Sequence, residues 1–546
     1  MLSKRYILPI LLALASPGMA QQTPPNVLLI VADDMGYTDI GPFGSEIATP
    51  TLDALADEGQ LLTNFHVLAS CSPSRSVLLS GMDNHRAGLG TMSEMMSDKI
   101  KGLPGYEGHL SHRVAALPEV MKAGGYDTYM VGKWHLGEET EDFPSARGFQ
   151  DTFVLVDGGG SHWADQKWVT PTVPMHYARN GQEVATLPDD FYSTKNYTDE
   201  LIAWIERDQA NGKPFFAYLA YTAPHDPLHA PAEYIDKYRG KYDRGWDNLR
   251  KTRLQRLKDL GMVSPDVTPF PRLGSVAAWE NLSDEERAMA ARDMEVYAAM
   301  IDYMDEQIAR VITSLKETGQ YENTMILFMS DNGANGAHLD DYPGQTPEYM
   351  AAFDNSLENR GLKNSLIDQG PGWAQVSMIP SRLFKGSKAE GGIRSPLVVK
   401  MPANMPTGTG INGSFLHIRD IMPTILEAAG IEVPNEEFEG RAILPVQGNS
   451  VLPLLKGEIA QTGPETTEVG YELFDQKAYF KAPWKALWMP EPFGTGEWEL
   501  YNIESDPGEL NDLGKKYPEM LAELVDLWEQ YSTENGVLDL MSQDGH

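Results

Sequence analysis

The sequence contains one cysteine, Cys71, which opens the segment Cys71-Ser72-Pro73-Ser74-Arg75. Ser72 or Ser74 can cap the start of a helix, and Pro73 suits its first turn. We therefore expect Cys71 at the amino end of a helix, where anions are stabilised. From these residues alone, Cys71 is either a nucleophilic thiol with a lowered pKa or a buried, inert cysteine. A single cysteine excludes an intrachain disulfide.

Two pairs of oxygen-bearing side chains follow short apolar runs, residues 26–32 and 324–329. Both runs have the composition of strands that are buried on both faces. The pairs are Asp33 with Asp34, and Asp331 with Asn332. Carboxylate and amide oxygens suit a hard divalent cation. However, Asp-Asp is also a common cap and Asp-Asn-Gly a common turn, so each pair taken singly is also typical of structure alone.

Basic side chains and histidines follow two further apolar runs. Lys133 and His135 come after residues 128–131, and because they are two apart they point the same way on extended backbone. His225 comes after residues 214–220. Alone, each would be typical of a surface or loop residue. Their common place after strands is what indicates a site.

The elements that must position these residues alternate along the chain. We expect strands at Asn26–Ala32, Thr128–Val131, Pro214–Ala220, Thr324–Met329 and Pro396–Lys400. We expect helices at Thr51–Glu58, Leu117–Ala123, Tyr197–Arg207, Ser283–Thr318 and Ile418–Ala429. Such alternation predicts an α/β fold whose sheet is covered on both faces. In these folds sites gather at the carboxyl ends of the strands.

The last hundred residues have a different pattern, with shorter apparent strands and one final helix. We expect strands at Glu468–Phe474, Tyr479–Phe480, Trp484–Met489 and Trp498–Ile503, and a helix at Pro518–Tyr531. This predicts a small antiparallel sheet packed on the main domain. The predicted division is a signal segment over 1–20, a large α/β domain over 21–446 and a smaller α+β domain over 447–546.

Residues 1–20 have the pattern of a secretory signal. Lys4 and Arg5 precede an apolar stretch from Ile7 to Ala15, and small residues at 18–20 suit cleavage. The apolar stretch is shorter than the roughly 20 residues that cross a bilayer. We therefore expect a periplasmic or secreted protein without a membrane anchor.

The chain is strongly acidic, with a formal net charge of −34. Removal of residues 1–20, which carry two basic residues and no acidic one, would leave −36. Such a surface repels nucleic acid and anionic membranes, so we expect no nucleic-acid partner. An anionic substrate would need a local cationic pocket.

The segment from Cys71 to Arg75 resembles the signature of the type I sulfatases, in which Cys-x-Pro-x-Arg directs enzymatic oxidation of the cysteine to formylglycine. The similarity runs from Asn26 to the segment Trp498-Glu-Leu-Tyr-Asn-Ile and Asp506-Pro-Gly-Glu, and it is greatest to the bacterial arylsulfatases. It implies an alkaline phosphatase-like fold, a large mixed and mostly parallel sheet sandwiched by helices with a smaller C-terminal antiparallel sheet. It also implies hydrolysis of sulfate esters, with an aryl sulfate giving a phenol and inorganic sulfate.

The resemblance also implies a metal site. Its ligands would be Asp33, Asp34, Asp331, Asn332 and a hydroxyl of hydrated formylglycine 71. The family chemistry favours one Ca²⁺, with Mg²⁺ as second choice. A formylglycine-generating enzyme would be a partner during biogenesis, and we expect a monomer.

The remaining roles come from the matching family motifs. Lys133 and Arg75 would contact the sulfate, and His135 the second hydroxyl of the nucleophile. His225 would protonate the leaving alcohol with help from Lys385, which lies five residues before the Glu of a Gly-Gly motif. Lys388 is the surface alternative to Lys385. In the implied mechanism the hydrate attacks sulfur, and deprotonation by His135 then expels sulfate.

Several alternatives stay open. A phosphomonoesterase or phosphonate monoester hydrolase could share the fold and a similar metal site, and a catalytically silent protein could bind sulfated glycans. The natural ester could be an aryl, alkyl or carbohydrate sulfate. Trp163, Trp168 and Trp373, in regions expected to vary, either stack on the substrate or belong to the core.

Overall fold

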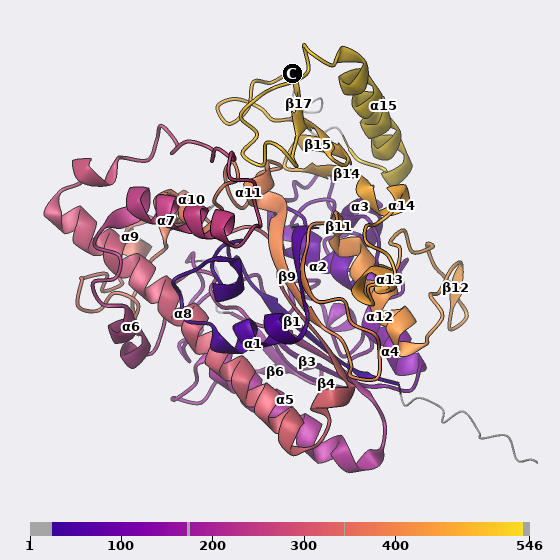
Figure 1. Cartoon of the computed structure of the whole chain (residues 1–546). Coiled ribbons are helices and arrows are strands. Elements are labelled where there is room, and N and C mark those ends of the chain that lie inside the picture. The colour runs from indigo at the N-terminus through magenta and orange to yellow at the C-terminus, as the bar shows by residue number, and fades with distance from the viewer. Residues whose placement is uncertain (1–23, 172–174, 343, 539–546) are drawn as a thin grey trace, which may run out of the picture.

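The computed structural model describes residues 24–171, 175–342 and 344–538. The predicted signal segment lies outside these residues. A mixed eleven-stranded sheet forms the centre of the described chain (Figure 1). Its strands are β1 (Asn26–Ala32), β2 (Gln60–His66), β3 (Asp127–Lys133), β4 (Asp151–Leu155), β5 (Tyr177–Arg179), β6 (Gln182–Val184), β7 (Phe215–Ala220), β8 (Thr324–Ser330), β9 (Arg394–Lys400), β10 (Gly410–Asn412) and β11 (Leu416–His417).

Strand β1 lies inside the sheet, whose order is β10-β2-β9-β8-β1-β7-β3-β4-β5-β6 with β11 beside β2. It pairs in parallel with β7 and β8, and β3 pairs in parallel with β7. Strand β9 is antiparallel to both β2 and β8, so β2 runs in the direction of β8. The carboxyl ends of β1, β2, β3, β7 and β8 therefore meet at one edge of the sheet.

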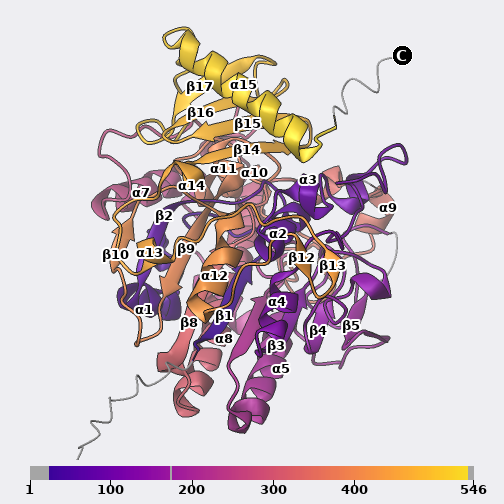
Figure 2. The ribbon, with the colours of Figure 1, turned by 90° about the vertical axis from the view of Figure 1, so that its right-hand side faces the viewer.

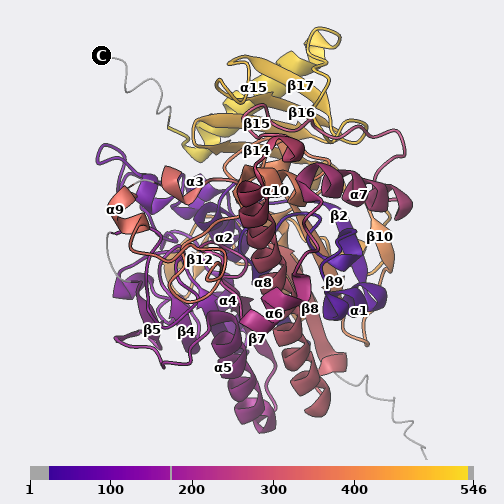
Figure 3. The same cartoon turned by 90° about the vertical axis from the view of Figure 1, so that its left-hand side faces the viewer.

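Helices cover both faces of this sheet. Alternate residues of β1 enter two separate cores, with Leu28 and Ile30 on one side and Val27, Leu29 and Val31 on the other. The first core is covered by α1 (Pro50–Glu58), α5 (Ser193–Asp208), α6 (Ala232–Tyr238), α7 (Gly245–Asp259), α8 (Asp284–Glu317) and α10 (Gly370–Ser377), several of which face the viewer in Figure 3. The second is covered by α2 (Cys71–Ser80), α4 (Leu117–Ala123), α12 (Ile421–Ala429) and α13 (Leu452–Leu455), seen in Figure 2.

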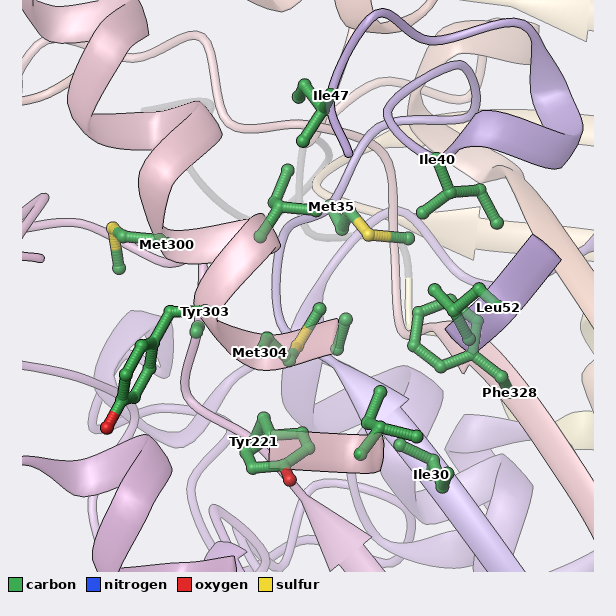
Figure 4. Packing of buried hydrophobic residues seen from close by; sticks show 14 of the residues in the cluster. Ile30, Met35, Ile40, Ile47, Leu52, Tyr221, Met300, Tyr303, Met304 and Phe328 are labelled. Atoms are coloured by element: carbon green, nitrogen blue, oxygen red, sulfur yellow. The ribbon is translucent and has the colours of Figure 1, made fainter. Parts of the chain in front are cut away.

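Helix α8 is the longest of the described helices, and its residues Met300 and Met304 enter the first core (Figure 4). Its start is fixed by a capping box, in which Ser283 Oγ accepts from the Glu286 N–H and the Glu286 carboxylate accepts from the Ser283 N–H. Met304 of α8 lies in the same core as Ile30 and Phe328, and all three are fully buried. Each such side chain contributes about 1.5–3 kcal/mol by its removal from water, so this packing holds β1 and β8 in place.

A small antiparallel sheet with one helix packs against the main body. Its strands, in sheet order, are β14 (Glu468–Leu473), β15 (Gln476–Lys481), β16 (Trp484–Trp488) and β17 (Trp498–Asn502), and α15 (Pro518–Asn535) contacts all four. Tyr479 and Leu500 face α15, whereas Phe480 and Tyr501 enter the second core of the main sheet. The predicted fold class, a large mixed sheet sandwiched by helices with a small C-terminal antiparallel sheet and helix, is confirmed. The boundary at residues 446 and 447 stays a prediction.

Strand β2 was absent from the predicted elements. Its sequence, Gln-Leu-Leu-Thr-Asn-Phe-His, carries polar residues at both ends and in the middle, and a register shift against β9 interrupts it between Leu62 and Phe65. Among the described helices, none combines the length and apolar character that crossing a lipid bilayer requires.

His85 links the main body to the C-terminal sheet. It lies in α3 (Asn84–Ala87), fully buried, with Nδ1 2.9 Å from Asp83 Oδ1 and Nε2 2.9 Å from Glu472 Oε2 in β14. Tyr531 of α15 donates to the other oxygen of Asp83. Burial lowers the pKa of His85, but hydrogen bonds to the two carboxylates outweigh it and raise the pKa to about 9.

We predict that this link weakens as the pH rises. Because the pKa is raised from 6.5 to about 9 on folding, the contribution is fully present below pH 6.5 and is lost as the pH passes 9. A shift of this size corresponds to about 3 kcal/mol. His85→Gln should therefore lower Tm clearly at about pH 6 and much less at about pH 10, measured by calorimetry against wild type. An equal loss of Tm at both pH values would contradict the assignment.

Candidate active site

The carboxyl ends of β1 and β8 bring the two predicted oxygen-bearing pairs together. Ala32 and Ser330 are register partners, so Asp33 and Asp331 leave the sheet side by side. The Asp34 N–H lies 3.3 Å from Asp331 Oδ1, and Asn332 Nδ2 donates to Asp34 Oδ1 at 2.6 Å. All four side chains are buried. The structure thus forms the cluster that the strand order predicts.

Cys71 is the first residue of helix α2, which follows β2 at the same edge. The helix N-cap is Ser70, whose side chain makes no capping hydrogen bond, so the predicted caps Ser72 and Ser74 are wrong. Ser74 instead accepts from the Leu68 N–H at 2.9 Å and donates to the Leu68 carbonyl at 3.2 Å. This pair of bonds closes the turn before Cys71. The predicted position at the amino end of a helix is confirmed.

The Cys71 thiol lies within the acidic and basic cluster. Its Sγ is 3.2 Å from Lys385 Nζ and 3.5 Å from Asp34 Oδ1, and the residue is 1% exposed. Burial raises the pKa of the Cys71 thiol, and this outweighs the neighbouring Lys133 and Lys385. This direction contradicts the interpretation of Cys71 as a thiol with a lowered pKa, because the effect of burial is the largest of the contributions.

Buried cations surround the carboxylates. Lys133 Nζ donates to both oxygens of Asp33 at 2.9 and 2.8 Å. Arg75 Nε donates to Asp331 Oδ2 at 2.8 Å, and its Nη1 donates to the Lys133 carbonyl at 2.8 Å. Burial alone would raise the pKa of Asp33, but Lys133 above all, with the other cations, holds this pKa well below its usual range. Asp33 is therefore ionised at any ordinary pH.

Lys385 and His225 lie against Asp34. Lys385 Nζ donates to Asp34 Oδ2 at 2.7 Å and is 3.5 Å from His225 Nε2, which is itself 3.4 Å from Asp34 Oδ2. His225 Nδ1 lies 3.1 Å from Asp226 Oδ1. Lys388, the alternative to Lys385, is buried elsewhere, over the Phe474 ring. Of Lys385 and Lys388, only Lys385 therefore lies in the site.

The loop that carries Lys385 is held by the C-terminal sheet. Gln476 of β15 donates to the Gly386 carbonyl at 2.9 Å. Lys485 of β16 donates to Glu390 at 2.9 Å and to Glu509 at 2.7 Å, all fully buried. The small sheet thus anchors one wall of the site.

Nine of the ten predicted residues form one connected network of contacts, and His135 lies at its rim. His135 Nε2 is 3.2 Å from Glu94 Oε1. Glu94 was not among the site residues predicted from the sequence. An added Cβ on Gly158 would lie 2.6 Å from the His135 ring, and one on Gly159 2.9 Å from the His225 ring. The two rings therefore flank consecutive glycines. The run Asp157-Gly-Gly-Gly was the available signal for this close approach.

Burial alone would raise the pKa of Glu94, but the facing His135 and its hydrogen bond lower the pKa to about 2. Glu94 thus stays ionised near neutrality and fixes the ring of His135. Of the three tryptophans considered as substrate contacts, Trp373 is fully buried against Trp246 and Trp279 and belongs to the core.

The donor set fits a divalent metal ion. Within the described residues, Asn332 Oδ1 is buried and has no hydrogen-bond partner, which leaves an amide oxygen free for a ligand bond. Asp33, Asp34, Cys71 and His225 place donor atoms within 4.8 Å of one another. Oxygen donors from two carboxylate-bearing strand ends suit Ca²⁺ or Mg²⁺.

Carboxylates, cations and one buried cysteine lie together at the carboxyl edge of this mixed sheet, an arrangement that suits a hydrolase of anionic esters. The chain belongs to the sulfatase family, since the Sulfatase family model matches residues 25–431. A second model, N-sulphoglucosamine sulphohydrolase, C-terminal, matches residues 385–533. The protein is thus a sulfuric ester hydrolase, and the family implies formylglycine and a metal.

Related proteins agree with this assignment. An uncharacterized sulfatase of Schizosaccharomyces pombe is 45% identical over 531 residues, which cover 95% of each chain. An arylsulfatase of Klebsiella aerogenes is 42% identical over 79% of this chain and 92% of its own. The crystal structure of Ps i-CgsB in complex with k-i-k-neocarrahexaose shares the fold, with a TM-score of 0.66 at 23% identity over 94% of each chain.

We predict that Glu94 positions His135. Glu94→Gln should lower kcat for a chromogenic aryl sulfate by roughly 10-fold, with KM changed less than about 2-fold, because the ring loses its charged acceptor. Glu138→Gln is the matched control, since Glu138 is exposed and feels the charges of Glu94 and His135. It should leave kcat within about 2-fold. Equal losses in both variants would show a mere charge effect.

Proposed function

We propose that this sulfatase hydrolyses aryl sulfates to a phenol and inorganic sulfate, with formylglycine formed from Cys71 and one bound Ca²⁺. The observation that carries the proposal is the place of Cys71, between Lys385 Nζ at 3.2 Å and Asp34 Oδ1 at 3.5 Å. The choice of an aryl ester is supported by the 42% identity with the Klebsiella aerogenes arylsulfatase.

Formylglycine, once formed and hydrated, would supply a hydroxyl that attacks sulfur. Asp33, Asp34, Asp331 and Asn332 would hold the metal, which would supply positive charge beside the sulfate. Arg75 and Lys133 are buried beside these carboxylates and orient the sulfate oxygens. If each preorganised contact is worth roughly 3–4 kcal/mol in the transition state, three of them supply about 10 kcal/mol.

His225 and His135 carry out the proton transfers. His225 Nε2, 3.5 Å from Lys385 Nζ, gives a proton to the leaving phenolate oxygen, and the Lys385 ammonium stabilises the charge that develops there. His135, whose Nδ1 is buried and without a hydrogen-bond partner among the described residues, takes the proton that releases sulfate. Glu94 holds the opposite nitrogen of that ring.

A carbohydrate sulfate is the second candidate. Ps i-CgsB, which shares the fold, was solved with k-i-k-neocarrahexaose, and Trp163 and Trp168 here are partly exposed and follow the Gly158–Gly160 run in the sequence. A phosphoryl substrate is less well supported, because a dedicated phosphatase needs no modifiable cysteine. We also propose export to the periplasm or the medium, from the pattern of residues 1–20.

The first test is peptide mass spectrometry of the active protein with turnover of a chromogenic aryl sulfate. We expect residue 71 to be about 18 Da lighter than cysteine. Cys71→Ala should lose activity by roughly 10³-fold or more, because no nucleophile remains. Unmodified cysteine in a fully active enzyme would overturn the formylglycine proposal. Phosphate monoester turnover above that of the sulfate would favour the phosphoryl alternative.

A second test addresses the metal. Asn332→Leu removes the free amide oxygen at similar volume, so the Ca²⁺ affinity should fall by roughly 10-fold or more. Asn64→Leu, a half-buried asparagine on β2, is the control and should bind Ca²⁺ like wild type. Titration calorimetry measures both, and Mg²⁺ should bind wild type more weakly. Unchanged Ca²⁺ affinity in Asn332→Leu would contradict this ligand assignment.

A further inference from the structure

A second cluster of metal-ligating side chains lies outside the site described above. His109 Nδ1 is 2.5 Å and His112 Nε2 is 3.2 Å from the same oxygen, Asp142 Oδ1. Donor atoms of the three residues all lie within 4.8 Å of one another. The Asp142 side chain is 7% exposed, whereas that of His112 is 49% exposed. The cluster is therefore anchored on one side and open to solvent on the other.

Two arginine side chains hold the backbone that carries the two histidines. Arg147, fully buried, donates to the carbonyls of Leu110 and Val114. Arg441 donates to the carbonyls of His112 and Val114. Four bonds from two arginines thus fix the turn that presents the histidines, so little ordering entropy remains to be lost when a ligand binds.

We propose that His109, His112 and Asp142 form a second metal site, which binds a borderline-soft transition ion such as Zn²⁺. Two imidazoles and one carboxylate match the donor preferences of Zn²⁺, whereas Ca²⁺ and Mg²⁺ prefer oxygen alone. Three protein ligands leave a fourth position for water on the exposed side of His112. Zn–N and Zn–O bonds of about 2.0–2.2 Å need only a small separation of the rings from Asp142.

The site would join the segment that follows Lys133 and His135 to the rest of the domain. The Leu110 N–H donates to the Leu136 carbonyl at 2.9 Å, and Trp134 Nε1 donates to the Asp142 carbonyl at 3.0 Å. An added Cβ on Gly137 would lie 2.4 Å from Asp142 Cβ and 2.9 Å from His109 Cβ. An ion bound here would therefore hold the loop just beyond His135, at Gly137, between the ligands His109 and Asp142. In this role the ion would brace the loop, and the proposal does not depend on the identity of the ester.

The test uses untagged, full-length protein saturated with Ca²⁺, with Zn²⁺ as the titrant and Co²⁺ as the spectroscopic probe. Wild type should bind one Zn²⁺ beyond the Ca²⁺ site, and its Tm should rise by roughly 2 °C or more at saturation. Co²⁺ should give a visible absorption band that Zn²⁺ removes. His112→Ala should abolish the Zn²⁺ binding and the band while the protein keeps the wild-type Tm without Zn²⁺, because the ring is half exposed.

His338→Ala is the matched control. His338 also pairs with a carboxylate, Asp368, at 3.0 Å and is 57% exposed, but it is not part of the His109, His112 and Asp142 cluster. This variant should bind Zn²⁺ like wild type. Asp142→Asn should lose binding and, if it is less stable, His112→Ala still decides the question. Absence of Zn²⁺ binding to wild type, or equal binding to His112→Ala, would overturn the proposal.

Discussion

The site depends on the pairing of buried opposite charges. Three carboxylates, Asp33, Asp34 and Asp331, lie beside three cations, Arg75, Lys133 and Lys385, and each carboxylate has a cation within 2.9 Å. Isolated charges would cost several kcal/mol each in such a position, and the loss of one partner would leave the other unpaired. The cluster is thus close to neutral inside a strongly acidic protein, which allows an anionic ester and a divalent cation to enter together.

The sheet is the device that makes this pairing feasible. Each of five strands ends at the same edge, so Asp34 and Asn332, which are 298 positions apart in the chain, meet without long side chains. Gly132 shows how closely the strands must approach, since an added Cβ would lie 1.7 Å from the Ala220 carbonyl oxygen. The C-terminal sheet completes the edge by holding the Lys385 loop through Gln476 and Lys485. The C-terminal sheet therefore supports the site as well as covering the core.

Much of this arrangement could be predicted from the sequence, because short apolar runs followed by polar residues identify parallel strands and their carboxyl ends. The ends of β1 and β8 and the choice of Lys385 required only spacing and a family motif. The sequence could not show Glu94, because it lies in a single 3-10 turn, Ser93–Met95, which is too short for a periodic pattern, and it contacts His135 only through the fold. It also misplaced the helix cap, since Ser70, Ser72 and Ser74 are equally good caps by type, whereas in the structure Ser74 bonds to Leu68 in the preceding turn and the N-cap is Ser70.

The burial of Cys71 constrains the order in which the chain folds and residue 71 is oxidised. The thiol is 1% exposed at the bottom of the charge cluster, behind Lys385 and Asp34. The oxidation that the proposed function requires must reach a side chain that the finished fold buries. Modification must therefore precede the closure of the domain or await its local opening. A chain that folds before this modification therefore stays inactive until the domain opens locally.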